Sequence, residues 1–565
     1  MNEPLPVNPA TLAGRTAFVS LLASEGVDVL FGNPGTTELA IMQALTEQSQ
    51  IGYVLGLQES IVVGMADGYA RASGRLAACN VHVAPGLGNA LGALYNAKFY
   101  GSPVLVTAGQ QEQGFGLTEP MLYDALVPMA APYVKWAVEV TRVQDLPRIV
   151  RRAAKVALTP PTGPVFLSLP GDILDASAEL DLGAPTRVVA ANRPSDDTIA
   201  QLVAALQGAQ RPVMIAGHEL ATREAFAEAS ELASLLGIPV YQQTVPTAAH
   251  FPSEHPAYMG WISRSQLQVR AVLERHDLLL LLGAEQLRMS VFNRIDALPA
   301  GLRIVQVSER DWELGKNYPT ELAVLANVKE TLRALNAALT RTQTAATRDA
   351  AAGRLRALAD DNWAARRRRA VDDGSQLASV RPLDPRFLML RLVECLPREV
   401  VVVDEGLTST ASLLNVLPYR DPQGYYGLAS GGIGFAIAGA IGISLALRPR
   451  PVVAIIGDGS AMYSIQALWT AANMRLPIVY VIANNRGYRI IKERMKSMRG
   501  SERFLGMDFR DPEINFVALA ESMGVPALRI TDAEQIAPAL ATALARTGPT
   551  LLEVAVADGF GGARR

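Results

Sequence analysis

Several features that mark whole classes of protein are scarce in this sequence. Only 2 cysteines, Cys79 and Cys395, occur among 565 residues, which excludes a disulfide framework and fits a reducing compartment. The 52 Lys and Arg residues are balanced by 54 Asp and Glu residues, and the net charge of -2 offers no general attraction for nucleic acid or an anionic membrane. Residues 1–6 lack the basic and apolar regions of a signal peptide, so we expect a cytoplasmic protein.

The apolar content, by contrast, is high. Hydrophobic residues make up 49% of the chain and charged residues 19%, which excludes disorder as the dominant state because this much apolar surface can bury a sizeable core. A length of 565 residues predicts four domains, or three large ones.

One uncharged stretch raises the question of a membrane span. No charged residue occurs between Gly424 and Leu447, and residues 434–447 are apolar or small. The stretch is dense in Gly and Ala, however, as close packing against a sheet or a partner subunit requires, and a second apolar run, Val452–Ile456, follows after only four residues. We therefore expect a buried helix rather than a spanning one.

The chain divides into three blocks in which short apolar runs alternate with helical segments. In the first block, about residues 8–185, the runs are typical of strands buried on both faces, and helical segments such as Glu59–Ser73 and Gly88–Tyr100 lie between them. Its expected strands are Val27–Phe31, Leu76–Val81, Pro103–Ala108 and Pro164–Leu169. This alternation predicts a parallel sheet covered on both sides.

The second block, about residues 190–340, and the third, about 380–560, repeat the pattern. The expected strands of the second block are Pro212–Ala216, Pro239–Tyr241, Leu278–Leu282 and Arg303–Val307. Those of the third are Val400–Asp404, Pro451–Ile456, Ile478–Ala483 and Thr550–Ala555. The predicted fold class is therefore α/β with three doubly wound parallel-sheet domains, and ligands are expected at the carboxyl ends of the strands.

Residues 341–379, between the second and third blocks, are rich in Ala, Arg and Thr and are expected to form a largely solvated helical connector. The run Arg366–Arg369 within it suggests a nucleic-acid or partner patch. Acidic residues flank the run on both sides, and no aromatic residues are interleaved for base stacking, so we interpret it as a solvated helix face.

The strongest chemical signal lies at the end of one expected strand of the third block. Gly457 and Gly459 allow a sharp turn and close approach to a ligand, and Asp458 between them is a hard oxygen ligand. Asn485 follows 27 residues later, after one helix and one strand, which returns the chain beside its starting point. A carboxylate, an amide oxygen and a nearby backbone carbonyl suit Mg²⁺, whose other positions are filled by substrate phosphate and water. The alternative is a Gly-Asp-Gly turn with an unrelated Asn-Asn pair.

This Gly-Asp-Gly-Ser and Asn-Asn pattern resembles the signature shared by the thiamin diphosphate-dependent 2-oxo acid decarboxylases and the acetohydroxyacid synthases. Further segments are most similar to the benzoylformate decarboxylases, and the similarity covers nearly the whole chain in family order. These segments are Phe31–Leu39, Leu57–Ser60, Ala66–Arg71, Asn80–His82, Gly86–Ala90 and Thr107–Gln111.

The resemblance implies a pyrimidine-binding domain, a middle domain without cofactor contacts and a diphosphate-binding domain, in that order. It also implies thiamin diphosphate and Mg²⁺ as cofactors. In this family the active sites form between subunits, which implies a homodimer or, more usually, a homotetramer. The expected partner is a small-molecule 2-oxo acid, with no nucleic acid and no membrane.

Glu59 resembles the glutamate that contacts N1' of the cofactor's aminopyrimidine, where a carboxylate favours the tautomer that removes the thiazolium C2 proton. The apolar sequence around it, Val54–Val63, fits the shelter that this contact needs. A glutamate at a helix N-terminus can also serve as a cap or a dipole partner, and both roles can hold together.

Further cofactor contacts follow from the same resemblance. Ile433 matches the bulky apolar residue that props the cofactor into its bent shape, with plain core packing as the alternative. Gly487 matches the position that lends a backbone carbonyl to the metal bound by Asp458 and Asn485. The other implied cofactor contacts are Leu407, which can contribute only its backbone, Thr408, Gly457, Gly459, Ser460 and Tyr488.

His82 lies at a strand end just before a Gly-rich loop and matches an active-site histidine of the benzoylformate decarboxylases. An imidazole there can protonate the carbon from which CO₂ has left, or orient the substrate carboxylate. A histidine that only fixes the loop backbone is the alternative. Thr36 replaces the serine of that family and keeps a hydroxyl able to bind a carboxylate.

Three features depart from the resemblance. Ser290 replaces the second histidine that the benzoylformate decarboxylases bring from their middle domain, which would slow protonation and favour attack on a second carbonyl compound. Ile491 and Arg494 replace apolar and aromatic pocket residues; Arg494 either favours an anionic group at the far end of the substrate or points to solvent. The Arg-Phe-Asp-Asp-Arg pattern with which acetohydroxyacid synthases hold FAD does not occur, so no flavin is predicted.

The sequence thus predicts a lyase that uses thiamin diphosphate and Mg²⁺ to decarboxylate a 2-oxo acid to an aldehyde, with carboligation as a further activity. One alternative is a carboligase of the acetolactate synthase type that works without FAD. Another is a non-catalytic homologue, against which the intact set of Glu59, Asp458 and Asn485 argues.

Overall fold

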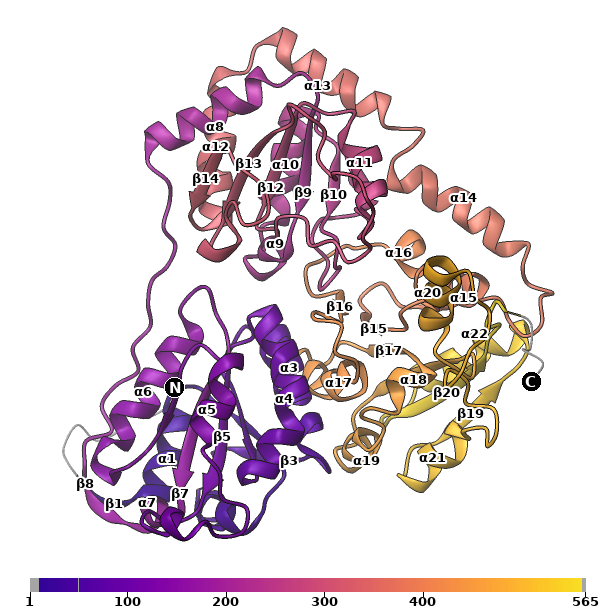
Figure 1. The fold of residues 1–565 in the computed structure, drawn as a ribbon. Coiled ribbons are helices and arrows are strands. Elements are labelled where there is room, and N and C mark those ends of the chain that lie inside the picture. Colours follow the sequence, from indigo (N-terminus) through magenta and orange to yellow (C-terminus); the bar gives the residue numbers. More distant parts are fainter. Residues whose placement is uncertain (1–9, 49, 561–565) are drawn as a thin grey trace. The chain divides into compact units, whose positions relative to one another are not determined.

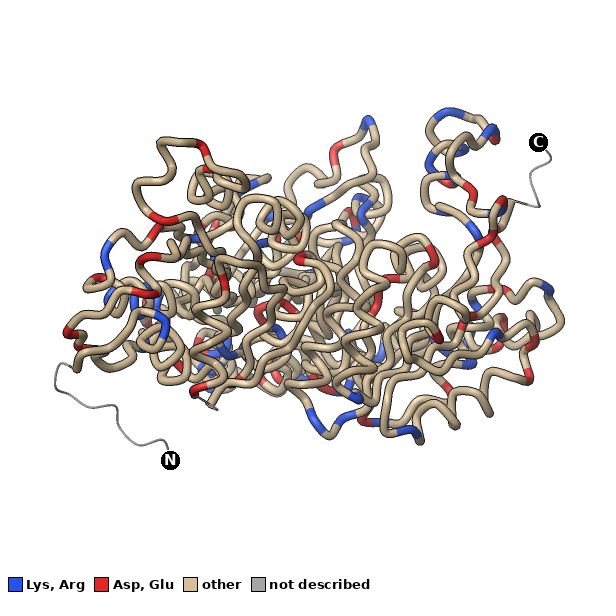
Figure 2. Tube along the Cα trace, turned by 90° about the horizontal axis from the view of Figure 1, so that it is seen from below, with Lys and Arg blue, Asp and Glu red and all other residues tan. Residues whose placement is uncertain are grey.

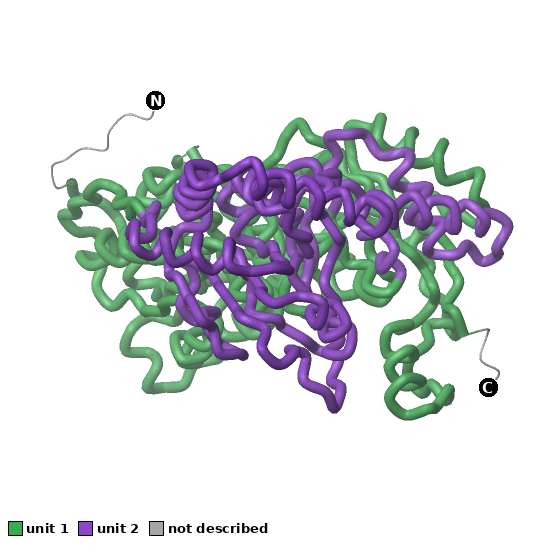
Figure 3. Tube along the Cα trace, turned by 90° about the horizontal axis from the view of Figure 1, so that it is seen from above, with its two compact units in different colours: residues 1–189, 403–408, 428–565 green, residues 190–402, 409–427 purple. Residues whose placement is uncertain are grey.

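The computed structural model describes residues 10–48 and 50–560, so the N-terminal hexapeptide and the first two residues of the predicted first block lie outside the described residues. The chain forms two compact units (Figure 3). One unit holds residues 1–189, 403–408 and 428–565, and the other holds residues 190–402 and 409–427. Lys and Arg positions are interspersed with Asp and Glu positions along most of the trace (Figure 2).

Three six-stranded parallel sheets organise the chain, which confirms the predicted fold class (Figure 1). The strand orders are β3-β2-β4-β5-β7-β6, β11-β10-β9-β12-β13-β14 and β16-β15-β17-β18-β20-β19. The first sheet and its helices come from the N-terminal part of the chain, the second from the middle and the third from the C-terminal part.

The N-terminal sheet is covered by helices that connect its strands. Its strands are β2 (Val29–Gly32), β3 (Gly52–Leu55), β4 (Ala77–Val81), β5 (Val104–Gln110), β6 (Ala137–Glu139) and β7 (Val165–Pro170). A separate antiparallel pair joins β1 (Ala10–Ala13) to β8 (Ser177–Leu180). The helices are α1 (Gly14–Ser24), α2 (Leu39–Glu47), α3 (Glu59–Ser73), α4 (Val83–Tyr100), α5 (Leu126–Ala130), α6 (Leu146–Leu158) and α7 (Gly171–Asp175).

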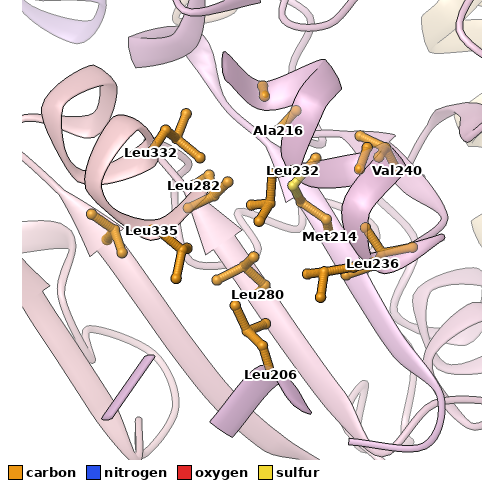
Figure 4. Close-up of a cluster of buried hydrophobic side chains, with 14 of the residues drawn as sticks. Leu206, Met214, Ala216, Leu232, Leu236, Val240, Leu280, Leu282, Leu332 and Leu335 are labelled. Atoms are coloured by element: carbon orange, nitrogen blue, oxygen red, sulfur yellow. The ribbon is translucent and has the colours of Figure 1, made fainter. Parts of the chain in front are cut away.

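The middle sheet is buried on both faces, as its apolar runs predict. Its strands are β9 (Pro212–Ala216), β10 (Val240–Gln242), β11 (Tyr258–Trp261), β12 (Leu278–Leu282), β13 (Arg303–Ser308) and β14 (Leu322–Leu325). Leu280 and Leu282 pack with Leu232 of α10 and Leu332 of α12 on one face (Figure 4), whereas the alternate residues of β12, Leu279 and Leu281, belong to a separate cluster. The helices of this part are α8 (Asp196–Gly208), α9 (His218–Thr222), α10 (Phe226–Leu236), α11 (Gln266–Leu273) and α12 (Val328–Thr342).

The predicted connector, residues 341–379, contains two helices, α13 (Ala345–Ala357) and α14 (Trp363–Ser375). The connector is less solvated than the sequence suggests, because Trp363 is only 4% exposed and joins the apolar cluster of the middle sheet. Within the arginine run, Arg366 pairs with Asp361 at 2.9 Å. An acidic neighbour therefore partners this arginine, in agreement with a role on the helix face.

The C-terminal sheet carries the predicted metal motif on two neighbouring strands. Its strands are β15 (Val401–Glu405), β16 (Tyr425–Gly427), β17 (Val452–Gly457), β18 (Ile478–Asn484), β19 (Ala527–Ile530) and β20 (Thr550–Ala555). Its helices are α15 (Pro385–Cys395), α16 (Leu413–Val416), α17 (Phe435–Ala446), α18 (Asp458–Ala461), α19 (Ala467–Asn473), α20 (Arg489–Arg499), α21 (Phe516–Ser522) and α22 (Ala533–Leu544).

The uncharged stretch includes α17, which is buried from Phe435 to Ser444 against α3. The two helix backbones touch at glycines. A Cβ at Gly68 would lie 2.2 Å from the carbonyl oxygen of Gly439, and a Cβ at Gly442 would lie 2.0 Å from that of Met65. Among the described residues no helix has the length and apolarity to cross a membrane, so the expectation of a buried helix is confirmed.

Candidate active site

Three neighbouring strands of the N-terminal sheet deliver the predicted catalytic residues to one edge. Strands β3, β2 and β4 lie side by side, and each runs in the same direction. Glu59 follows β3, Thr36 follows β2 and His82 follows β4. Because carboxyl ends of parallel strands meet at the same edge, these three residues belong to one face of the domain.

His82 is held by a carboxylate that no local sequence pattern marks. Its Nδ1 lies 2.7 Å from Oε2 of Glu38, whose side chain is fully buried. Glu38 in turn accepts hydrogen bonds from the backbone N–H groups of Gly35 and Gly109, each at 2.9 Å. Glu38 is therefore a fixed acceptor that orients the imidazole.

Two features of the surrounding loop keep the imidazole in place. A Cβ at Gly35 would lie 2.1 Å from Nδ1 of His82, so only glycine fits there. Val83, the residue after His82, has a φ of +38°, which is unusual for a β-branched residue and indicates a backbone held in an unfavourable conformation. The hydroxyl beside the histidine belongs to Thr37, with Oγ1 at 3.3 Å from Nδ1, whereas the predicted Thr36 is exposed.

Glu59 is the first residue of α3 and is half-buried. The helix is capped by Gln58, whose side-chain oxygen accepts from the backbone N–H of Ser60 at 2.7 Å, so Glu59 is not needed as a cap. Its Oε2 accepts a hydrogen bond from Asn89 at 3.0 Å. A Cβ at Gly86 would come within 2.9 Å of Oε1, so this glycine gives the carboxylate room.

The predicted metal ligands converge at the carboxyl ends of β17 and β18, which are paired strands. Asp458 is 2% exposed, and its Oδ2 accepts from the backbone N–H of Gly487 at 3.0 Å. Asn485 is 5% exposed, and its Oδ1 is buried without a hydrogen-bond partner among the described residues. An orphaned amide oxygen beside a buried carboxylate is the arrangement that a bound cation would complete.

These donors fit Mg²⁺ with thiamin diphosphate. Burial raises the pKa of Asp458 to about 6, and a cation beside it would restore the ionised form. The described residues contain no group of three or more His, Cys, Asp or Glu side chains that could hold a metal, so a single carboxylate and neutral oxygens are all that the chain offers here. Mg²⁺ binds in this way when phosphate oxygens complete its shell.

The turn that carries Asp458 is closely packed. Tyr488 packs its ring edge-on against Phe509, with centroids 4.6 Å apart, and a Cβ at Gly459 would lie 2.7 Å from the Tyr488 ring. Gly457 ends β17, and Ser460, in the helix that follows, is 4% exposed. This part of the chain is thus closely packed, with little room for larger side chains.

Leu407 and Thr408 follow β15, and the structure explains how a leucine can serve there. Leu407 has a φ of +48° and a side chain that is 40% exposed, so its conformation is not set by burial of the side chain. Such strain at a non-glycine residue is typical of functional loops. The backbone of this loop, rather than the Leu407 side chain, is what it can present to a diphosphate.

A second unforeseen carboxylate, Glu405, secures the turn that holds Ile433. Glu405 is 2% exposed at the end of β15 and accepts from the backbone N–H groups of Gly434 and Ala436 at the start of α17. It replaces the N-cap side chain that Gly434 cannot supply. Burial raises the pKa of Glu405 to about 7. Ile433 itself is half-buried.

The predicted pocket residues other than Thr36 and His82 lie in two places. Ile491 and Arg494 are exposed on α20, which begins directly after the metal loop, and the guanidinium of Arg494 has no hydrogen-bond or ion-pair partner among the described residues. The opposite side of the helix is anchored by Lys492, which is 1% exposed and lies 2.6 Å from Asp508. Ser290 is exposed in the other compact unit, in the loop after β12.

Comparison with known proteins identifies the family. Three family models match the chain: the N-terminal thiamine pyrophosphate (thiamin diphosphate) binding domain over residues 12–120, the central domain over 199–335 and the C-terminal thiamine pyrophosphate binding domain over 408–554. The chain belongs to the thiamine pyrophosphate enzymes. The predicted family, fold and cofactor are thereby confirmed.

Curated relatives and a solved structure agree with this membership. The chain is 34% identical over 543 residues to benzoylformate decarboxylase of Pseudomonas aeruginosa, covering 96% of this chain and 98% of that one. It is 27% identical over 562 residues to the acetolactate synthase large subunit of Parasynechococcus marenigrum, covering 98% and 88%. A thiamine diphosphate-dependent 4-hydroxybenzoylformate decarboxylase of Rhodococcus jostii is 31% identical, with a TM-score of 0.86 over 97% of this chain and 99% of that one.

Proposed function

We propose that this thiamine pyrophosphate enzyme decarboxylates a 2-oxo acid to an aldehyde, with Mg²⁺ as the partner of the cofactor. The observation that supports it most is the convergence of Glu59 and the Glu38–His82 pair at one edge of the N-terminal sheet, together with the orphaned Asn485 oxygen and the buried Asp458 at the strand ends of the C-terminal sheet. The whole-length similarity to decarboxylases of benzoylformate and 4-hydroxybenzoylformate points to the same reaction.

Thiamin diphosphate, when bound, supplies the carbon nucleophile and the electron sink that a 2-oxo acid needs to lose CO₂. Asp458, Asn485 and the backbone carbonyl of Gly487 would hold the Mg²⁺, and the backbone around Leu407 and Thr408 would meet the diphosphate. Ile433 would support the cofactor in its bent shape. Glu59 would hold a proton between its carboxylate and N1' of the aminopyrimidine ring.

His82 would act on the substrate. Because Nδ1 faces the acceptor Glu38 at 2.7 Å, the proton of a neutral imidazole belongs on Nδ1, and Nε2 is left for the substrate. Nε2 can then receive a proton from solvent and deliver it to the carbon from which CO₂ has left, or bind the substrate carboxylate when protonated. Thr36 and Thr37 offer hydroxyls on the same loop.

The far end of the substrate would meet α20. Residues 489–505 contain six basic and two acidic residues in a chain with a net charge of -2. Glu493 pairs with Arg489 and Glu502 pairs with Lys496, so the local acidic residues leave Arg494 available. We therefore propose that the preferred 2-oxo acid has a negative charge at its far end, with Ile491 packing along its middle.

A carboligase of the acetolactate synthase type, working without FAD, is the second candidate. Ser290 stands where the resemblance implies a histidine. Without that imidazole, protonation of the reactive carbon would be slower, and its attack on a second carbonyl compound would compete better. The similarity to an acetolactate synthase large subunit over 98% of the chain favours the same alternative. The two candidate activities use the same cofactor site. They differ in whether the reactive carbon takes up a proton or attacks a second carbonyl compound.

One experiment separates the candidates. CO₂ release is measured from a panel of 2-oxo acids, including benzoylformate, pyruvate and branched and dicarboxylic members, with thiamin diphosphate and Mg²⁺, and the products are identified in the same samples. Free aldehyde supports the decarboxylase, and a hydroxy ketone or hydroxy acid supports the carboligase. Release of no CO₂ from any acid, or full turnover by a Glu59→Gln variant, contradicts both and favours a non-catalytic homologue.

We also propose a homodimer or homotetramer, with each active site shared between subunits, in the cytoplasm. Exposed apolar side chains on the N-terminal domain support an interface: Leu117 is 94% exposed and Met121 83% exposed. Both cysteines are free, which suits a reducing compartment. Sedimentation of the holoenzyme tests the assembly, and a monomer with full activity would contradict it.

A further inference from the structure

The segment Ala66–Arg71, which lies within α3, contains a buried carboxylate with four hydrogen bonds. Asp67 accepts from Arg71 through Nε at 2.8 Å and Nη2 at 2.7 Å, from Asn96 at 3.0 Å and from the hydroxyl of Ser102. The side chains of Asp67 and Arg71 are 1% and 0% exposed. A fully buried pair of this kind is retained only where its geometry is well satisfied.

From this carboxylate, one branch reaches the start of α17. The guanidinium of Arg71 lies 4.3 Å from the ring centroid of Tyr100 and 4.3 Å from that of Phe435. Phe435 is the first residue of α17 and comes two residues after Ile433. The buried arginine therefore fixes the residue that follows the Ile433 turn, and cation–π contacts are strongest in such desolvated surroundings.

The other branch reaches the opposite side of the same turn. Asn96, which is 3% exposed on α4, donates to Asp67 through Nδ2 and accepts through Oδ1. Its Oδ1 receives the backbone N–H groups of Ala429 at 3.3 Å and Ser430 at 3.1 Å, and the Ser430 hydroxyl at 3.2 Å. Asp67 thus holds the chain both before and after residues 431–434.

The turn between these two anchors needs such support. It reads Gly431-Gly-Ile-Gly434, and Gly431 and Gly434 have φ values of +85° and +111°, in the region that favours glycine. A glycine-rich turn loses much conformational entropy when it is fixed in one shape. Ile433 can support a ligand only if contacts outside the turn offset this loss of conformational entropy.

We propose that Asp67, Arg71 and Asn96 form a positioning network that fixes the height and angle of Ile433 for the cofactor. None of the three touches the cofactor in this scheme; each acts through the turn. The inference rests on the proposed function in one respect, because it takes Ile433 to be the residue that supports the cofactor.

The test is a double-mutant cycle on cofactor affinity, measured by titration calorimetry of the apoenzyme with thiamin diphosphate in excess Mg²⁺. Asn96→Ala removes the acceptor for the N–H groups of Ala429 and Ser430, and we expect the Kd for thiamin diphosphate to rise about 10-fold, as for the loss of hydrogen bonds to one buried group. Ile433→Ala should raise the Kd by at least as much. In the double variant the rise in Kd should be smaller than the product of the two single rises, because Asn96 acts through Ile433.

Phe435→Leu provides an independent variant, since it keeps an apolar side chain at the first position of α17 and removes the ring beside Arg71. It should also raise the Kd, and when it is combined with Ile433→Ala the rise should again be smaller than the product of the two single rises. This variant replaces Asn96→Ala in the test if that protein does not fold. The matched control is Asn336→Ala, which removes another buried asparagine, bonded to Glu228 and Glu231 in the middle domain. It should lower stability and leave the Kd unchanged.

Each outcome decides one question. If Ile433→Ala leaves the Kd unchanged, the placement of the cofactor on Ile433 is wrong, and the proposed role of the network is wrong as well. If Ile433→Ala weakens binding but Asn96→Ala and Phe435→Leu do not, the placement stands and the network is refuted. Effects of Asn96→Ala and Ile433→Ala that multiply in the double variant also refute it, because they indicate a separate, merely structural role.

Discussion

Oε2 of Glu38 and Nδ1 of His82 lie 2.7 Å apart, at the edge where three parallel strands end. The carboxylate is fully buried, and backbone N–H groups hold it in place, so it cannot turn away from the ring. This relationship selects the tautomer of the imidazole that carries its proton on Nδ1 and leaves Nε2 as an acceptor. Its consequence is that His82 depends on Glu38 for its chemical role.

Glu38→Gln should therefore lower kcat about 10- to 100-fold, as replacement of a histidine-orienting partner commonly does, because the amide can meet the ring as donor or acceptor and no longer fixes one tautomer. Steady-state kinetics measure this, and the same change made in a His82→Ala background should have little further effect. Glu139→Gln, on β6 of the same domain, is the control and should leave kcat unaltered. Equal kcat for Glu38→Gln and the wild type would contradict the role.

The central strands of all three sheets could be predicted, and the outer ones could not. In every sheet the four predicted strands occupy the four inner positions, whereas the two edge strands, such as β3 and β19, were missed. The physical reason is burial. A strand with neighbours on both sides and helices on both faces needs a continuous apolar run, but an edge strand such as β19 is partly exposed and tolerates residues such as Arg529.

The site shows a similar division. Residues that are marked by an unusual local pattern, such as Asp458 between two glycines, were found from the sequence. Glu38 and Glu405 were not, because an isolated glutamate in a loop or strand looks like a surface residue until its partners are known. Those partners are distant in sequence: His82 lies 44 residues after Glu38, and Ala436 lies 31 after Glu405. Only the fold brings them together.

The orphaned oxygen of Asn485 predicts opposite effects on stability and on binding. Asn485→Leu removes a buried Oδ1 that has no partner among the described residues, so the free energy of unfolding of the apoenzyme should rise by about 1 kcal/mol. The affinity for Mg²⁺ and thiamin diphosphate should fall more than about 100-fold, because a metal ligand is lost. Denaturant unfolding and calorimetry measure the two effects.

The neighbouring residue offers a matched control for that change. Asn484 donates to Glu553 at 2.8 Å and accepts from the backbone N–H of Arg486 at 3.0 Å. Asn484→Leu should therefore destabilise the apoenzyme instead of stabilising it. A loss of apoenzyme stability in Asn485→Leu as large as that in Asn484→Leu would indicate that the Asn485 oxygen has a structural partner and is no metal ligand.

The buried Glu405 should make apoenzyme stability depend on pH. Its pKa is raised from 4.5 to about 7 by burial, so the folded state keeps a proton that the unfolded state has already released. The contribution of this group is present in full below pH 4.5 and is lost as the pH rises to about 7, a decrease of about 3 kcal/mol. Glu405→Gln, which has no carboxyl group to ionise, should lose less stability over this range. Parallel stability curves for the two proteins would contradict the prediction.

Arg494 should set the preference for charge at the far end of the substrate. Its guanidinium is exposed on α20 and has no partner among the described residues, so a distal carboxylate would gain a charge-assisted contact. In the wild type, kcat/KM should be higher for dicarboxylic 2-oxo acids than for monocarboxylic acids of equal length. Arg494→Ala should reduce this ratio about 10-fold, and Arg494→Glu should reverse it. The control is Arg489→Ala, because Arg489 is paired with Glu493 at 2.9 Å and should not affect the ratio. An unchanged ratio in both Arg494 variants would mean that this arginine faces solvent and that the substrate is chosen elsewhere.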